Sequence, residues 1–255
     1  MLPMITGVEL TQGIWLFHSS EAGRNYGIAL SETGGALLVD PVLKSTEAEA
    51  VGRFLAEQGR SLHTIVLTAP LRTQDEAADL TILDRWPQAA RITPEAVAAP
   101  IHVAGPEQGW QVVPLRPGVH TALYNPGKRI LFPGRMLGGG PVPVLMGESR
   151  SYMSALEVVA GMDVKLLVPT SGQPAQGRRA VRQRVQHERQ YVSSLRMHII
   201  SAILSEATLE RVLGAAASVY ADYPFVQDHL HNLRIVWHEL HISDDTDQNG
   251  TGQDR

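Results

Sequence analysis

Apolar segments separated by glycine and asparagine turns fill the first forty residues of the chain. The pattern predicts strands of an antiparallel meander over residues 8–17, 26–30 and 36–39. A helix is expected next, over residues 46–58. Thr46 and Glu49 have the spacing of a capping box, in which each side chain satisfies the other's backbone donor, and Gly59 follows the last helical turn.

A strand, a loop and a helix then follow in β-α order. Apolar residues 64–67 form the predicted strand, and the helix begins at Thr73. Residues 92–168 are predicted to form short strands interrupted by proline and glycine, with one helix at 154–161 and a buried strand at 165–168. The order of these elements indicates an α/β fold.

Long stretches with helical periodicity replace the short strands after Pro174. Helices are predicted over residues 178–204, 209–220 and 225–240. Their apolar positions form stripes of the kind that pack against a domain or against a second subunit. A homodimer is therefore the expected assembly.

Charge and composition narrow the partners and the compartment. The chain has 255 residues and a formal net charge of −4, which does not favour a nucleic-acid backbone or an anionic membrane as a partner. It has no cysteine, which rules out disulfides and thiolate metal sites. No secretory pattern is found at the amino terminus, and no apolar run approaches the roughly 20 residues of a membrane span. A cytoplasmic location is expected.

Three short stretches carry a resemblance: Leu-Leu-Val-Asp-Pro at 37–41, Asn-Pro-Gly-Lys-Arg-Ile-Leu-Phe-Pro-Gly at 125–134 and Leu-Leu-Val-Pro-Thr-Ser-Gly at 166–172. Together with the element order, they make the chain from Gly7 to Gln173 resemble the metallo-β-lactamase superfamily. The resemblance implies an αββα sandwich with a helical C-terminal extension. The expected division is a metallo-β-lactamase-like domain at 1–174, a helical extension packed on it at 175–242, and a flexible acidic tail at 243–255.

Members of that superfamily hold two metal ions, usually zinc, and this chain departs from their ligand pattern. Zinc needs several imidazole nitrogens and carboxylate oxygens converging at about 2.0–2.2 Å. Thr68 is retained, but the ligand positions fall on Ala69, Leu71, Thr73, Gln74, Arg135 and Ser171. The guanidinium of Arg135 carries a permanent positive charge, which repels dications. We therefore expect no metal and no other cofactor.

The same alignment defines a remodelled ligand pocket. Its expected residues are Asp40, Thr68, Asp75, His120, Arg135 and Ser171. Arg135 is expected to fill the vacated space, where Asp40 or Asp75 can pair with it. His120, in Pro-Gly-Val-His-Thr at 117–121, has two interpretations: a retained metal-binding histidine displaced by one extra residue, or an ordinary strand residue.

Two other arrangements are disfavoured by the local sequence. Ser171, His120 and Asp75 can be written as a metal-free triad, but Ser171 lacks the Gly-x-Ser-x-Gly context of a nucleophile elbow. The run His238-Glu-Leu-His241 has one residue, not two, between its glutamate and its second histidine, so it is not the His-Glu-x-x-His signature of zinc proteases.

The leading hypothesis is a non-catalytic protein without a dizinc site, which binds a small anionic ligand or a protein partner. The alternative is an atypical hydrolase of an ester, lactone or thioester that uses a remodelled site around His120. A third hypothesis is a structural protein that oligomerises through its C-terminal helices. Fold resemblance does not decide among them, because one scaffold serves many chemistries.

Overall fold

The computed structural model describes residues 7–19, 23–41, 45–70, 85–103 and 109–248. The chain divides into two compact units. The first unit is Met1–Gly139 with Met162–Val181, and the second is Gly140–Gly161 with Arg182–Arg255. Within the described residues, no helix is long and apolar enough to cross a membrane.

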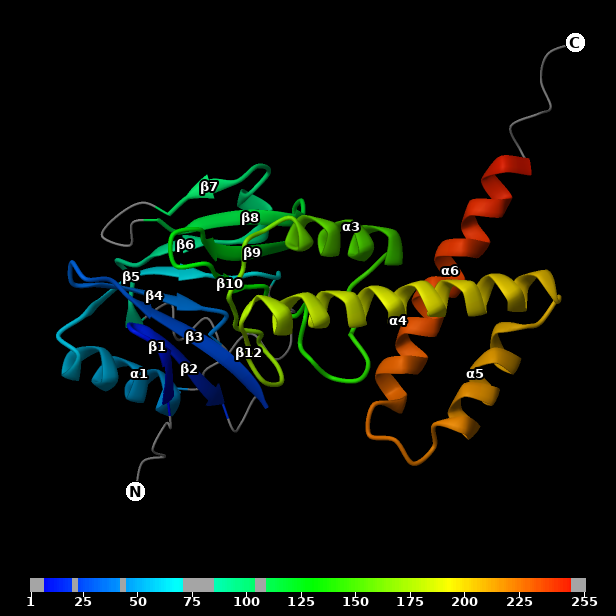
Figure 1. Ribbon diagram of the computed structural model, residues 1–255, viewed down its shortest axis with the longest axis horizontal. Coiled ribbons are helices and arrows are strands. Elements are labelled where there is room, and N and C mark those ends of the chain that lie inside the picture. The colour runs from blue at the N-terminus through cyan, green and yellow to red at the C-terminus, as the bar shows by residue number, and fades with distance from the viewer. Residues whose placement is uncertain (1–6, 20–22, 42–44, 71–84, 104–108, 249–255) are drawn as a thin grey trace, which may run out of the picture. The chain divides into compact units, whose positions relative to one another are not determined.

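The first unit contains two sheets, and each has six strands within the described residues (Figure 1). The strands of the first sheet are, in order, β1 (Gly7–Thr11), β2 (Ile14–Ser19), β3 (Arg24–Leu30), β4 (Gly35–Val39), β5 (Ser61–Val66) and β6 (Ala90–Ile92). The first four strands run antiparallel, and β4, β5 and β6 are parallel. Helix α1 (Ser45–Glu57) connects β4 to its parallel neighbour β5, as a crossover between parallel strands requires.

The second sheet follows later in the chain. Its strands are β7 (Ile101–His102), β8 (Gln111–Arg116), β9 (His120–Asn125), β10 (Ile130–Phe132), β11 (Leu166–Leu167) and β12 (Ala175–Gln176), preceded by the short 3-10 helix η1 (Pro94–Ala96). Neighbouring strands are antiparallel except for β10 and β11, which are parallel.

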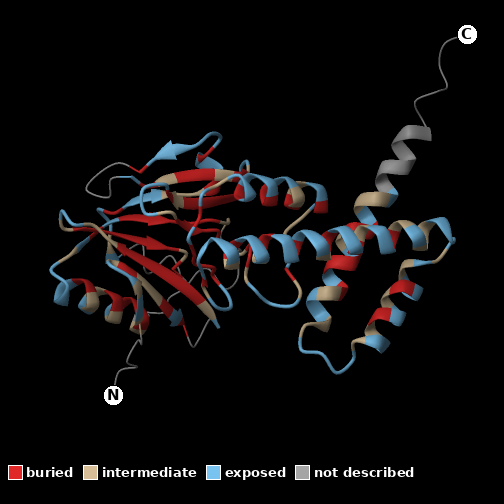
Figure 2. Cartoon of the chain, in the orientation of Figure 1, coloured by how far each residue is buried: buried red, intermediate tan, exposed pale blue. Residues whose placement is uncertain are grey.

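Successive side chains in the strands of the first sheet point to opposite faces, and this alternation separates two hydrophobic cores. In β4, Ala36 and Leu38 face α1 and pack with its Val51, whereas Leu37 and Val39 belong to a cluster shared with the second sheet. Both faces of this strand are covered, so all five of its residues are buried (Figure 2). The core between the sheets therefore forms from alternate residues of strands that lie far apart in the sequence.

Gly27 in β3 sets how closely the two sheets approach. A Cβ atom at this position would lie 2.2 Å from Cε1 of Phe132 in β10. Phe132 is buried and its ring lies 5.8 Å from that of Trp110, centroid to centroid, so the ring has little room to move. The missing side chain of Gly27 thus makes the space that the Phe132 ring occupies.

Helices make up the second unit: α3 (Ser149–Ala160), the greater part of α4 (Arg178–Leu204), α5 (Leu209–Val219) and α6 (Val226–Gln248). A polar cluster joins three of them. Glu239 of α6 accepts hydrogen bonds from the backbone and hydroxyl of Ser149 at the start of α3, each at 2.6 Å. Arg196 of α4 donates to Glu239 at 2.6 Å and also to Ser149. This network satisfies a backbone donor at the first turn of α3.

The α/β class and the sandwich with a helical C-terminal extension are confirmed. One strand prediction was wrong: residues 8–17 form a hairpin, not one strand, because the chain turns at Gly13, whose φ is 73°. The helix predicted at 154–161 begins earlier, at Ser149, and α6 continues past residue 240 to Gln248. The helix predicted from Thr73 lies outside the described residues.

We predict that Gly27→Ala lowers the free energy of unfolding by about 1–3 kcal/mol, because the added methyl group overpacks the core against Phe132. Urea denaturation measures the loss. Combining Gly27→Ala with Phe132→Leu should cost less than the sum of the two single changes. Gly214→Ala in α5 meets open space and is the matched control, with no loss expected. Equal losses at Gly27 and Gly214 would contradict the packing explanation.

Candidate functional site

Asp40 follows β4, and its carboxylate holds the loop that contains Thr68 through hydrogen bonds. Its carboxylate accepts hydrogen bonds from the backbone N–H and from the hydroxyl of Thr68, both at 2.7 Å. Burial raises the pKa of Asp40 to about 6, although these hydrogen bonds and the charges of Arg135 and Arg24 act to lower it. Asp40 has a φ of 48°, in the left-handed region, which short polar side chains tolerate.

His120 is the first residue of β9 and is 4% exposed. Its Nε2 lies 2.9 Å from the carbonyl oxygen of Pro133, and since a carbonyl only accepts, Nε2 carries the proton. Burial lowers the pKa of His120 to about 4, and the charges of Arg135 and Arg116 lower it further, against the hydrogen bond to Pro133, which raises it. The imidazole is therefore uncharged at neutral pH.

The turn at Gly134 brings these groups together. Its φ is 65°, and a Cβ atom would lie 2.0 Å from the Thr68 hydroxyl oxygen and 3.0 Å from Nε2 of His120. The Gly134 carbonyl accepts hydrogen bonds from the backbone and hydroxyl of Thr170, both at 3.0 Å. Only glycine fits this position, because any side chain would displace Thr68. Sequence reasoning gave Gly134 no role, although it ends the 125–134 stretch.

Asn25 holds the loop that contains Ser171. Its backbone N–H donates to the carbonyl of Thr170 at 2.7 Å, and its side-chain amide donates to the carbonyl of Gly172 at 2.8 Å. His18 in turn donates from Nδ1 to the Asn25 amide oxygen at 3.0 Å. Sequence reasoning missed Asn25, and its signal is a buried amide within an otherwise apolar strand.

Arg135 follows the glycine turn and is half-buried. Its positive charge lowers the pKa of both Asp40 and His120, so its guanidinium lies within electrostatic reach of both. Ser171 lies against Gly138, where a Cβ atom would be 2.6 Å from the serine hydroxyl oxygen. The structure thus gathers Asp40, Thr68, His120 and Arg135 in one region.

Comparison with solved structures identifies this architecture. The apo state of the chemotaxis sensor ODP from T. denticola matches with a TM-score of 0.53 and 13% identity, over 72% of this chain and 93% of that one. A metallo-β-lactamase from Hirschia baltica matches with a TM-score of 0.51 and 14% identity, over 72% and 98%. The DIM-1 metallo-β-lactamase gives 0.50 and 15%, over 73% and 97%.

This chain has the metallo-β-lactamase fold. At identities of 13–15%, the likeness concerns the fold and not the activity. No protein-family model and no curated protein matches the amino-acid sequence.

The residues at this site do not fit the two metal ions that the metallo-β-lactamase fold commonly holds. Ala69 and Ser171 provide no imidazole or carboxylate, and Arg135 brings a positive charge that acts on Asp40 and His120. The nearby donors are already engaged, Asp40 by Thr68 and Nε2 of His120 by Pro133. Among the described residues, no three histidine, aspartate or glutamate side chains form a group that could hold a metal ion.

Other residues were also predicted from the sequence to belong to the site. Four of the named positions, Leu71, Thr73, Gln74 and Asp75, lie outside the described residues. In the part of the chain that is described, Ser171 and His120 share no hydrogen bond, and Nε2 of His120 bonds to the carbonyl of Pro133. His120 is both a strand residue and a neighbour of Thr68 and Gly134, so the two interpretations of it do not exclude one another. The pocket formed by the six predicted residues stays a prediction.

We predict that the imidazole of His120 does not titrate between pH 8 and pH 5, because burial keeps it neutral to about pH 4. The measurement is the pH dependence of its Hε1 resonance by NMR. Arg135→Gln removes a positive charge that disfavours the imidazolium, so the pKa of His120 should rise in that variant. An unchanged pKa would show that Arg135 lies out of electrostatic reach.

Opposite effects of pH on stability are expected from the two buried groups. Folding lowers the pKa of His120 from 6.5 to about 4, so its contribution to stability is lost as pH falls through that range. Folding raises the pKa of Asp40 from 3.8 to about 6, so its contribution is lost as pH rises through that range. The variant Asp40→Asn keeps His120, so urea denaturation should show its stability rising from pH 4 to pH 6. The variant His120→Gln keeps Asp40, so its stability should fall over the same range. Identical pH profiles would contradict these assignments.

Proposed function

We propose that this protein is a non-catalytic member of the metallo-β-lactamase fold and that it binds a small anionic ligand beside Arg135. The observation that carries the proposal is the positive charge of Arg135, which acts on both Asp40 and a histidine that is held neutral, at a position that the family resemblance aligns with a bridging acid. A permanent positive charge in a partly buried site attracts an anion and repels a dication.

The balance of charge around the site supports an anion. Three arginines act on Asp40 or His120 through their charges, namely Arg24, Arg116 and Arg135. Thr68 already donates two hydrogen bonds to the carboxylate of Asp40. Since His120 adds no charge at neutral pH, the arginine charges that act on Asp40 and His120 favour a small carboxylate or phosphate over a cation.

The loops of the candidate site are also held in fixed positions. Hydrogen bonds from Thr68, Thr170 and Asn25 fix the loops that carry Asp40, Arg135 and Ser171. Preorganised loops favour binding, because little conformational entropy is lost when a ligand enters. A structural neighbour, the ODP protein of T. denticola, is described as a chemotaxis sensor, so a role in binding and signalling has a precedent on this fold.

Binding of an anion can be tested by thermal unfolding and calorimetry with inorganic phosphate, acetate and citrate. At a ligand concentration of about 100 times Kd, the native state should gain about 2.7 kcal/mol, and the midpoint of unfolding should rise by a few degrees. Arg135→Gln should abolish the gain. Arg53→Gln, at an exposed position of α1, is the matched control and should retain it.

Two results would contradict the proposal. Near-stoichiometric zinc, iron or manganese bound to tag-free protein, and lost on changing His120, would restore a metal site. Turnover of an ester, lactone or thioester that disappears in His120→Ala would instead favour the hydrolase hypothesis.

A further inference from the structure

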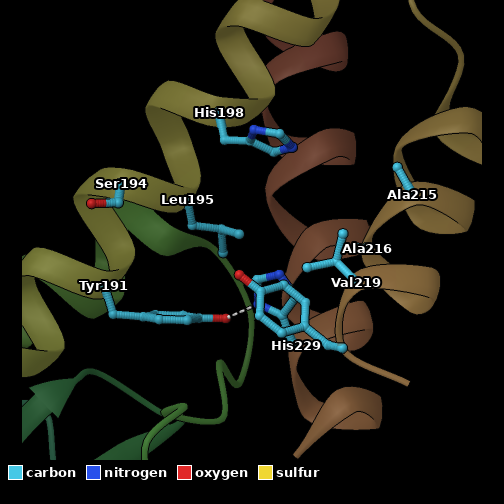
Figure 3. A pocket seen from close by; sticks show the side chains of 9 residues that line it. Tyr191, Ser194, Leu195, His198, Ala215, Ala216, Val219 and His229 are labelled. Carbon is cyan, nitrogen blue, oxygen red and sulfur yellow. Dashed lines mark hydrogen bonds between the residues drawn. The ribbon is translucent and has the colours of Figure 1, made fainter. Parts of the chain in front are cut away.

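A cavity of about 410 Å³ lies wholly within the helical unit, among α4, α5 and α6 (Figure 3). One face of α4 lines it with residues spaced three and four apart, Tyr191, Ser194, Leu195 and His198. Helix α5 contributes Ala215, Ala216 and Val219, followed by Tyr220, and α6 contributes His229. Its volume falls in the range of small-molecule sites, roughly 300–1,000 Å³.

Small side chains on α5 explain why this space is open. Ala215 and Ala216 face the stripe on α4 that carries Leu195 and His198 (Figure 3). A larger side chain at either alanine would fill the gap, as the packing of other apolar helix faces does. Ala216 is buried and Ala215 is exposed, so the cavity opens to solvent beside Ala215.

His229 is held in a fixed orientation at this cavity. The hydroxyl of Tyr191 and Nδ1 of His229 are hydrogen-bonded, with an oxygen–nitrogen distance of 2.8 Å, while the amide of Asn232 donates to the same hydroxyl at 3.1 Å. The His229 and Tyr220 rings meet edge to face, with centroids 4.9 Å apart. Because Nδ1 of His229 is engaged by Tyr191, Nε2 is the ring nitrogen left for a ligand.

Asn232 anchors this arrangement from the interior. It is fully buried, donates to the carbonyl of Pro143 at 2.6 Å and accepts from the backbone N–H of Leu145 at 2.9 Å. A fully satisfied buried network of this kind restricts the rotamers of the residues it joins. The side chains of Tyr191 and His229 are consequently held in place before a ligand binds.

The polarity of the side chains that line the cavity indicates which kind of ligand it can bind. None of the nine lining residues carries a permanent charge, and burial together with the charge of His198 lowers the pKa of His229. His198 points into the cavity (Figure 3) and has no hydrogen-bond partner among the described residues. The site thus combines a largely apolar lining with the imidazoles of His198 and His229.

We propose that this cavity binds a small uncharged molecule with an aromatic or aliphatic body and one hydrogen-bonding oxygen. The body packs on Leu195, Ala216 and Tyr220, and the oxygen bonds to an imidazole of His198 or His229. A carboxylate or phosphate is disfavoured here, because no permanent cation lines the cavity to offset its desolvation. This second site is separate from the anion site proposed beside Arg135.

The test uses 2-naphthol as the probe and 2-naphthoate as its charged analogue, with the full-length protein and isothermal titration calorimetry. We expect saturable binding of 2-naphthol below about 1 mM and at least tenfold weaker binding of 2-naphthoate. Ala215→Leu should weaken 2-naphthol binding at least tenfold by filling the cavity. Ser218→Leu adds the same side chain at an exposed position of α5 outside the lining and should leave binding unchanged.

Additional variants test whether the cavity is independent of the Arg135 site and whether an imidazole contacts the ligand. Arg135→Gln should leave 2-naphthol binding unchanged. The double change His198→Phe and His229→Phe keeps aromatic rings but removes both imidazoles, so binding of 2-naphthol should weaken while that of naphthalene does not.

Four outcomes would overturn the proposal: no saturation by 2-naphthol at about 1 mM, equal affinity for naphthol and naphthoate, equal effects of Ala215→Leu and Ser218→Leu, or a wild-type dimer that Ala215→Leu dissociates. The last outcome would assign the cavity to a second copy of the chain, with the exposed Val219 at the contact.

Discussion

The close approach of the turn at Gly134 to Thr68 is the contact on which the arrangement of the candidate site depends. It leaves no room for a side chain at Gly134, and it brings the loop after β10 against both the loop after β5 and the start of β9. Thr68 is in turn fixed by Asp40, and the Gly134 carbonyl is bonded by Thr170. Hydrogen bonds thus join the Asp40 loop to the Thr68 loop and the Gly134 turn to the Thr170 loop, and the close approach of Gly134 to Thr68 couples these two pairs.

This coupling explains how the site remains ordered with ligand residues that do not suit metal ions. In a metal centre, the ions hold the ligand loops together. Here, hydrogen bonds from Thr68, Thr170 and Asn25 join the loops, and Arg135 supplies positive charge near Asp40. The protonation of Asp40 and His120 is shifted in opposite directions, but burial favours the uncharged form of each.

The helical unit combines a different set of physical features. Its polar residues are organised in two networks, one at Glu239 and one at Asn232, and the second leads to the cavity. The cavity has a largely apolar lining without a permanent charge, whereas the site in the first unit is dominated by arginine charge. The two sites are therefore suited to ligands of different polarity, as expected from the cost of burying a charge without a partner.

Much of the fold and part of the site followed from the amino-acid sequence alone. Apolar periodicity located most strands and helices, and this inference succeeds because periodicity is a local property of the chain. The residues at positions 69, 135 and 171 led, through the family resemblance, to the prediction that the metal ligands are replaced, and this stays a prediction. The hairpin at Gly13 was missed, since one glycine changes the direction of the chain without interrupting the apolar pattern.

Only the tertiary structure decided which groups meet. The bond from His120 to Pro133, the role of Asn25 and the room that Gly27 leaves for Phe132 all join residues from different strands or loops. The cavity likewise takes residues from three helices. Such contacts depend on how the elements pack and on burial, which sets the pKa of Asp40 and His120, and neither property can be read from the spacing of residues along the chain.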